Sequence, residues 1–126
     1  FAGDLNNKKI LLLGVTYRQD IGDTRFSPSE TFVKEGIKEG ADISIFDPLV
    51  SFWEEMEMNL LSDLPDANNY DVAVFAVPHK EFALINLTKW IGNKNILLFD
   101  ANNVLTKKQI KEVNDNNFNY VSIGRG

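Results

Sequence analysis

The chain has 126 residues, of which 44% are hydrophobic and 25% charged, and its formal net charge is −5. This length and composition fit one globular domain with its own core. The negative charge argues against a nucleic-acid partner, and no apolar run is long enough for a membrane helix. Without cysteine and with one histidine, His79, the chain offers no thiol nucleophile and little from which to build a metal site. Nothing resembles a signal peptide, so we expect a cytoplasmic protein.

Residues 1–8 are polar and have no clear period, which is typical of a lead-in or the remnant of a linker, so we place the domain at 9–126. Continuous apolar runs follow, as expected for parallel strands covered on both faces. The predicted strands are Lys9–Leu13, Ile43–Phe46, Val72–Val77, Asn95–Phe99 and Tyr120–Ile123, with a shorter candidate near Met58–Leu61.

A helix is predicted after Ser27-Pro28-Ser29-Glu30, where the serine is an N-cap, the proline the first helical residue and the glutamate the partner in a capping box. The helix should end at Gly40 in a left-handed cap. Its expected buried side chains are those of Phe32, Val33 and Ile37.

The same capping box recurs at Thr106–Gln109, where Ile110 and Val113 should face inward. Residues 81–91 predict a further helix. Its apolar positions are Phe82, Leu84, Ile85, Leu87 and Ile91. Strands that alternate with helices indicate an α/β fold, a Rossmann-like doubly wound parallel sheet of five to six strands with helices on both faces.

In such sheets ligands bind outside the carboxyl ends of the strands. All three arginines of the chain, Arg18, Arg25 and Arg125, follow predicted strand ends. Arginine binds phosphate in a bidentate manner, so this pattern favours an anionic ligand. The alternative is a chance cluster, or structural ion pairs with Asp20 and Asp23.

A dinucleotide site of the usual kind is not predicted, because the loop after the first strand lacks the G-x-G-x-x-G pattern. Asp47 stands where an acid could bind a ribose, but with Pro48 behind it a role as a turn former is favoured. The sheet therefore should not carry its own NAD site.

The first loop, 14–27, is long for a connection between a strand and a helix, which favours a functional loop. Within it Tyr17 either stacks on a base or fills a gap under the loop. His79 is interpreted as a cap of the next helix rather than an acid–base group. Trp53 and Trp90 are interpreted as packing residues.

The segment from Gly14 to Pro28 resembles the signature of the UDP-glucose/GDP-mannose dehydrogenase family, roughly G-x-x-[FY]-K-x-[DN]-x-x-D-x-R-E-S-P. The likeness continues in order through most of the chain. Its further pieces are Gly40-Ala41-Asp42, Phe46-Asp47-Pro48, Asp71–Val77 with His79 and Phe82, Asp100 with Asn103-Val104-Leu105, and Gly124-Arg125-Gly126.

This resemblance implies an NAD-dependent enzyme that oxidises the C6 alcohol of a nucleotide-sugar to a carboxylate. Other regions of the polypeptide would bind NAD, supply the catalytic cysteine and lysine, and form a homodimer. The present chain would be the C-terminal nucleotide-sugar-binding domain, without catalytic residues of its own and inactive alone. Tyr17 and Arg18 would contact the nucleotide-sugar, and Arg25 would reach the NAD pyrophosphate.

Three departures from the family pattern matter. Arg18 stands where lysine is usual, and Phe26 replaces the common glutamate beside Arg25. Asn102 replaces an arginine that many members use for the substrate pyrophosphate, and Arg125 is the candidate to compensate.

The Val77-x-His79-x-x-Phe82 run is closer to members that act on UDP-N-acetyl-hexosamines than to those that act on UDP-glucose. We therefore lean towards the first substrate and keep the second open. The alternative function is a non-catalytic nucleotide-binding or assembly module with the same fold.

Overall fold

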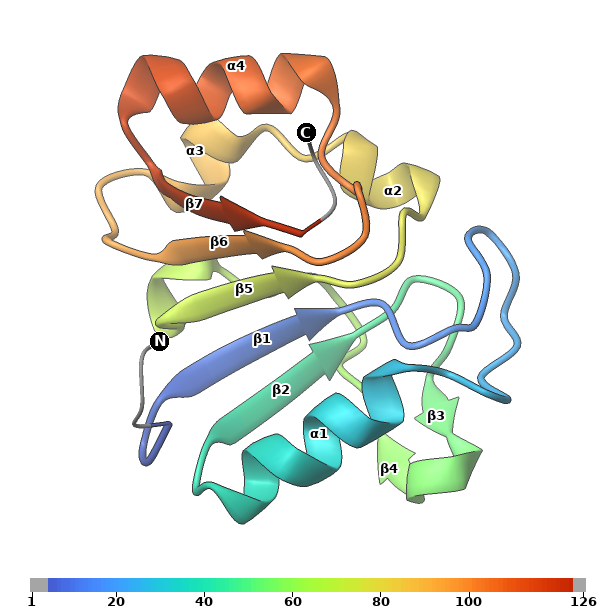
Figure 1. Ribbon diagram of the computed structural model, residues 1–126. Helices are drawn as coiled ribbons and strands as arrows, with labels where there is room; N and C mark the ends of the chain where they lie inside the picture. The colour runs from blue at the N-terminus through green and yellow to red at the C-terminus, as the bar shows by residue number, and fades with distance from the viewer. Residues whose placement is uncertain (1–4, 124–126) are drawn as a thin grey trace.

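The computed structural model describes residues 5–123, which form a parallel five-stranded sheet between two layers of helices (Figure 1). The strands follow the order β2-β1-β5-β6-β7. Their bounds are Lys9–Leu13 for β1, Asp42–Phe46 for β2, Val72–Phe75 for β5, Leu97–Asp100 for β6 and Asn119–Ser122 for β7. The strand order reverses between β1 and β5, which is the switch point of a doubly wound sheet. The predicted fold class is confirmed.

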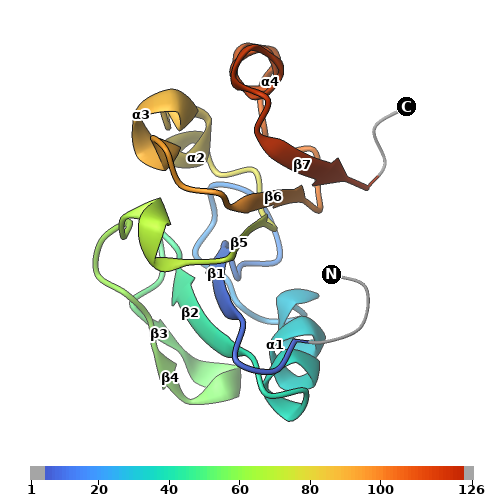
Figure 2. The ribbon, with the colours of Figure 1, turned by 90° about the vertical axis from the view of Figure 1, so that its left-hand side faces the viewer.

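Helices cover the two faces of the sheet unequally (Figures 1 and 2). Helix α1 (Ser29–Lys38) lies over β1 and β2 on one face. The opposite face carries α2 (Lys80–Ala83), α3 (Leu87–Ile91) and α4 (Lys107–Asn116). Two single turns, η1 (Glu54–Met56) and η2 (Ala67–Asn69), lie in the long connection between β2 and β5.

The apolar run of β1 is buried because alternate side chains enter different cores. Leu11 and Leu13 pack with the residues of α2, α3 and α4, whereas Ile10 and Leu12 pack with Val33 of α1. The burial of β1 on both faces agrees with the prediction from its continuous apolar run.

Helix α1 departs from its prediction at its first turn. It begins at Ser29, and Pro28 in the N-cap position makes no side-chain capping bond, so the predicted capping box is wrong. The Ser27 hydroxyl still accepts the N–H of Ser29 at 3.2 Å, but the Ser27 N–H donates to the carbonyl of Thr24, so the bond back from Glu30 has no place.

The far end of α1 follows the prediction better than its middle. Gly40 has φ +88° and donates to the carbonyl of Ile37, which confirms the left-handed end. Val33 is buried, but Phe32 and Ile37 are exposed, so their predicted burial is wrong. The side chain of Phe32 instead lines an open groove beside α1, with Leu12 and Val74 of the sheet.

Residues 81–91 form two short helices, so the single predicted helix is wrong. Asn86 separates them: its side chain accepts the N–H of Lys89 and thereby starts α3. Leu84 lies at the break and is exposed. Helix α4 matches its prediction, because Thr106 and Gln109 form a reciprocal capping box and Val113 is buried.

The sixth candidate strand does not join the main sheet. Met58–Asn59 (β4) pairs antiparallel with Phe52–Trp53 (β3), and Leu61 makes one bridge to Phe46. Trp53 is fully buried, which confirms its packing role. At the chain's start Leu5 packs against the core on the α1 side, so residues 5–8 lie against the domain.

Candidate functional site

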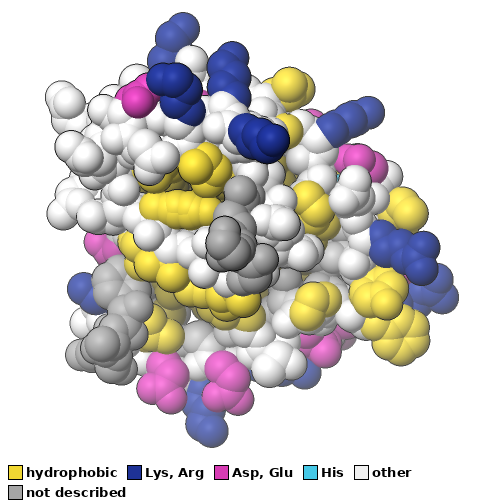
Figure 3. All heavy atoms as spheres, turned by 45° about the horizontal axis from the view of Figure 1, so that its top comes forward, with side chains coloured by type: hydrophobic (Ala, Val, Ile, Leu, Met, Phe, Trp, Pro, Cys, Tyr) yellow, Lys and Arg dark blue, Asp and Glu magenta, His cyan; other side chains and the backbone are white. Residues whose placement is uncertain are grey.

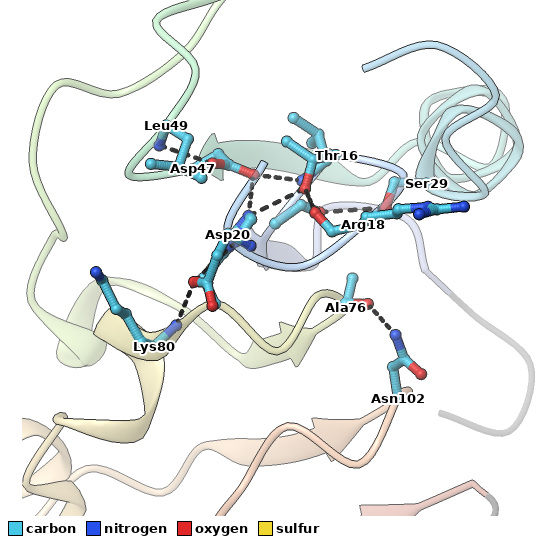
Figure 4. A network of polar contacts seen from close by, with 12 residues as sticks. Thr16, Arg18, Asp20, Ser29, Asp47, Leu49, Ala76, Lys80 and Asn102 are labelled. Carbon is cyan, nitrogen blue, oxygen red and sulfur yellow. Dashed lines mark hydrogen bonds and ion pairs between the residues drawn. The ribbon is translucent and has the colours of Figure 1, made fainter. Parts of the chain in front are cut away.

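Three buried polar side chains meet where neighbouring strands end. Thr16 follows β1, Asp47 follows β2 and His79 follows β5, and the three strands are adjacent in the sheet. Thr16 and Asp47 point towards one another in Figure 4, with Asp20 close by. We call Thr16, Asp20, Asp47 and His79 the polar cluster.

The hydrogen bonds of the polar cluster assign its protons. Asp20 N–H donates to His79 Nδ1 at 2.8 Å, so Nδ1 is an acceptor and the ring proton is on Nε2. His79 Nε2 lies 3.0 Å from Asp47 Oδ2 and 3.1 Å from Thr16 Oγ1. The Thr16 hydroxyl donates to the carbonyl of Arg18 at 2.8 Å, so its oxygen accepts from the ring. The imidazole is therefore neutral, with each nitrogen in one role.

Asp47 also organises the loops after β1 and β2. Its carboxylate accepts the N–H of Val15 and of Leu49, both at 2.9 Å. The bond to Leu49 closes a turn, so the turn-forming interpretation of Asp47 is confirmed. The carboxylate is buried and cannot serve as an exposed ribose acid.

His79 does not cap the next helix through its side chain. The residue occupies the N-cap position of α2, but its ring makes no capping bond there. The ring turns into the polar cluster, packs 5.7 Å from the ring of Phe82 and is 1% exposed. The capping interpretation is wrong, because the ring's two nitrogens are used by the neighbouring loops.

A second buried carboxylate shapes the loop after β6. Asp100 accepts the N–H groups of Asn102 at 3.2 Å, Val104 at 2.8 Å and Leu105 at 3.0 Å. Asn102 then donates from its side chain to the carbonyl of Ala76 at 3.3 Å, which holds it beside the end of β5 (Figure 4).

The structure brings three predicted substrate residues to one hollow. Tyr17, Arg18 and Asn102 line an open depression of about 500 Å³ at the carboxyl ends of β1, β5 and β6, which we call the Tyr17 hollow. Tyr17 is 56% exposed, so it does not fill a gap under the loop. Arg18 Cζ lies 5.8 Å from the centre of its ring, and the Arg18 side chain extends away from the polar cluster in Figure 4.

Arg25 lies in a different hollow of about 500 Å³, which it shares with Glu54 and Glu55. Its guanidinium forms an ion pair with Asp23 at 2.8 Å. The ion pair with Asp23, which was the alternative to an anionic ligand, is therefore formed. The hydrogen bonds from Arg25 lower the pKa of Asp23 to about 2, and the same pair raises the pKa of Arg25. Asp20 instead accepts the N–H of Lys80. Arg125 lies outside the described residues.

An apolar groove adjoins the Tyr17 hollow. Figure 3 shows hydrophobic side chains gathered on the sheet face that α1 leaves uncovered. The groove has a volume of about 440 Å³, and Asn102 borders both it and the hollow. Its apolar lining includes Leu12, Phe32, Val74, Ala76, Phe99 and Ala101.

Residues 11–107 match the sequence model of the UDP-glucose/GDP-mannose dehydrogenase family, UDP binding domain. The chain belongs to this family. The matched residues include β2, β5, β6 and the last three residues of β1, together with the Tyr17 hollow and the polar cluster.

Relatives of two specificities are similar to this UDP binding domain. It is 28% identical to UDP-glucose 6-dehydrogenase of Rickettsia conorii over 97% of this chain and 29% of that protein. It is 31% identical to UDP-N-acetyl-D-mannosamine dehydrogenase of Methanococcus maripaludis over 80% of this chain and 24% of that protein. The chain thus spans under a third of the length of these curated relatives.

Solved structures agree on the fold. An NDP-N-acetyl-D-galactosaminuronic acid dehydrogenase from Methanosarcina mazei superposes with a TM-score of 0.79 at 23% identity, over 98% of this chain and 26% of that one. A UDP-D-ManNAc dehydrogenase from Pyrococcus horikoshii gives 0.73 at 22% identity, over 98% and 27%.

Sequence reasoning missed the polar cluster of this UDP binding domain, although a signal was present. Thr16, Asp47 and His79 each follow a strand within four residues of its end. Their convergence depended on the strand order, which brings β2, β1 and β5 together. Among residues 5–123 there is no group of three or more His, Cys, Asp or Glu side chains that could hold a metal ion. No helix in the same range is long and apolar enough to cross a membrane.

Proposed function

We propose that this chain binds the nucleotide part of a UDP-sugar as one domain of an NAD-dependent nucleotide-sugar 6-dehydrogenase. The observation that carries the proposal is the Tyr17 hollow, where an exposed aromatic ring, a guanidinium and an amide meet at the switch point of the sheet. No carboxylate among residues 5–123 forms an ion pair with Arg18, which leaves its guanidinium for a diphosphate. Arg125, beyond the described residues, is proposed as a further phosphate contact.

We assign a single NAD contact to this chain. The loop after β1 lacks the glycine spacing with which a dinucleotide loop lets pyrophosphate approach, and the glycine it has, Gly14, packs against Val77: a Cβ added there would lie 2.7 Å from Val77 Cβ. Arg25 is the residue we assign to the pyrophosphate of NAD, and it would exchange Asp23 for that anion. NAD supplies a hydride acceptor when bound, and other regions of the polypeptide would hold most of it, as well as the catalytic groups.

The sugar is proposed to be a UDP-N-acetyl-hexosamine or UDP-glucose, because relatives similar to this chain carry both names. The motif around His79 favours the hexosamine, but the buried ring cannot touch either sugar. We further propose that the full-length protein is a homodimer in the cytoplasm.

The test is NADH formation by the full-length polypeptide with each UDP-sugar. We expect Arg18→Ala to raise KM for the UDP-sugar, and Arg25→Ala to raise KM for NAD, each by roughly ten- to a hundredfold through loss of a charge-assisted hydrogen bond. Lys108→Ala, on the exposed side of α4, is the control and should change neither.

Equal and small effects of both arginine variants on both ligands would contradict the assignment. UDP binding without NADH formation would favour the non-catalytic module. The present chain alone should form no NADH, because it has no cysteine to act as the nucleophile.

A further inference from the structure

We propose that His79 is a positioning residue for the nucleotide-sugar: its neutral ring holds the segment that presents Tyr17 and Arg18, without touching the ligand. The inference rests on the proposed function and deepens it. It starts from the two ring nitrogens, which bond to opposite ends of one short segment of the first loop.

The segment from Thr16 to Asp20 is anchored at both ends by the same imidazole. Nδ1 accepts the N–H of Asp20 at 2.8 Å. Nε2 donates to Thr16 Oγ1 at 3.1 Å. The Thr16 hydroxyl in turn donates to the carbonyl of Arg18 at 2.8 Å, which also restrains Arg18. The two proposed ligand residues, Tyr17 and Arg18, lie between these anchors.

The Asp20 anchor holds a backbone conformation that is unfavourable by itself. Asp20 has φ +59°, in the left-handed region that residues other than glycine adopt at a cost. Its N–H bond to the ring and the bond from Lys80 N–H to its Oδ1, at 2.9 Å, stabilise this turn. Loss of the ring acceptor should release the turn and let the Tyr17 and Arg18 side chains sample other positions.

The ring itself is rigidly placed and shielded from any ligand. It is 1% exposed, and its Nε2 lies 3.0 Å from the buried carboxylate of Asp47, which is in turn held by the N–H of Val15 and of Leu49. A chemical role in catalysis is therefore excluded for this ring by geometry, whereas a role in preorganisation fits every contact it makes.

Two substitutions of His79 distinguish the contributions of the two ring nitrogens. Asparagine places an acceptor where Nδ1 lies, so His79→Asn can keep the Asp20 bond and loses the bonds of Nε2 to Asp47 and Thr16. The bond from the Thr16 hydroxyl to the carbonyl of Arg18 remains in this variant. Glutamine places a donor where Nε2 lies, so His79→Gln can keep the Asp47 bond and loses the Asp20 bond. Positioning through Asp20 predicts that only the second variant frees the segment.

The experiment compares both variants in the full-length polypeptide by KM for UDP-sugar, KM for NAD and amide hydrogen exchange at residues 17–20. We expect His79→Gln to raise KM for UDP-sugar about tenfold, to leave KM for NAD unchanged and to speed exchange of the Asp20 amide. His79→Asn should stay within about threefold of the unmodified protein in both constants. Leu84→Ala, at an exposed position of the same connection, is the matched control.

Equal effects of the two variants on KM for UDP-sugar, or an equal rise in KM for NAD, would overturn the positioning role. Should His79→Gln not fold, Thr16→Val takes its place, since valine matches threonine in shape and removes the hydroxyl that accepts from His79 Nε2 and donates to the carbonyl of Arg18. Its KM for UDP-sugar must then rise. Failure of the proposed function is separate: the unmodified protein would neither turn over a UDP-sugar nor bind UDP, whatever the exchange rate of the Asp20 amide.

Discussion

The two halves of the first loop are stabilised in opposite ways. Residues 14–20 are held by buried groups, the polar cluster and the close approach of Gly14 to Val77. Residues 21–27 are held by the exposed Asp23–Arg25 pair, and their last apolar side chain, Phe26, is 86% exposed. One hydrogen bond, from Tyr17 N–H to the carbonyl of Asp23 at 2.9 Å, links them.

This difference indicates that one half of the loop is rigid and the other half adaptable. Buried hydrogen bonds are costly to break and fix a geometry, whereas an exposed ion pair contributes little and rearranges readily. We therefore expect the half that presents Tyr17 and Arg18 to be preorganised. The half that carries Arg25 should adapt when an anion replaces Asp23.

The largest effect should follow from the removal of the Asp47 carboxylate. Asp47→Ala leaves the N–H groups of Val15 and Leu49 without their acceptor and removes one of the two acceptors of the His79 ring proton, so we expect a loss of about 3 kcal/mol in the free energy of unfolding. Urea unfolding of this chain measures it. A loss below about 1 kcal/mol would mean that the buried half is no better fixed than the exposed half.

A smaller effect is expected at the start of the same half. Gly14 has φ +103°, and an added Cβ would lie 2.9 Å from the backbone nitrogen of Val77. We expect Gly14→Ala to cost about 2 kcal/mol in unfolding free energy, through backbone strain and displacement of the loop after β5. Gly92→Ala is the control for strain alone, because Gly92 has φ +58° and open space around it.

The junction of the exposed half with α1 should be less sensitive. Ser27→Ala removes one acceptor for the Ser29 N–H and should cost about 0.5 kcal/mol. Thr106→Ala, which breaks the reciprocal capping box of α4, should cost about 1 kcal/mol. Urea unfolding of the two variants compares the single bond at the start of α1 with the reciprocal capping box of α4. Equal losses of unfolding free energy would show that the reciprocal box contributes no more than the single bond.

The smallest effect on stability belongs to the exposed pair. We expect Arg25→Gln to leave the urea midpoint unchanged and to return the pKa of Asp23 from about 2 towards 3.8, as followed by carboxyl NMR shifts during an acid titration. The folded-state pKa is depressed, so any stability from this pair is present above pH 3.8 and is lost as the pH falls through about 2. An unchanged Asp23 titration in the variant would show that Arg25 is not the cause of the shift.

Local patterns predicted most of the fold. The five strands lie within two residues of their predicted bounds, and the capping box at Thr106 is reciprocal as expected. These features depend on neighbours in the chain. Errors arose where a second local hydrogen bond replaces the predicted one: Ser27 N–H bonds to the carbonyl of Thr24, and the side chain of Asn86 starts a new helix within the predicted one.

By itself the sequence determined the parallel sheet and the family signature from Gly14 to Pro28, because both depend on residues that are consecutive in the chain. Tertiary structure alone decided that Thr16, Asp47 and His79 form one cluster, since those residues lie 31 and 32 positions apart along the chain and meet only through the order β2-β1-β5. It also decided the ring's protonation, because Nδ1 becomes an acceptor only when the N–H of Asp20 faces it. Hydrogen-bond roles of this kind are set by partners in space, and no local pattern encodes them.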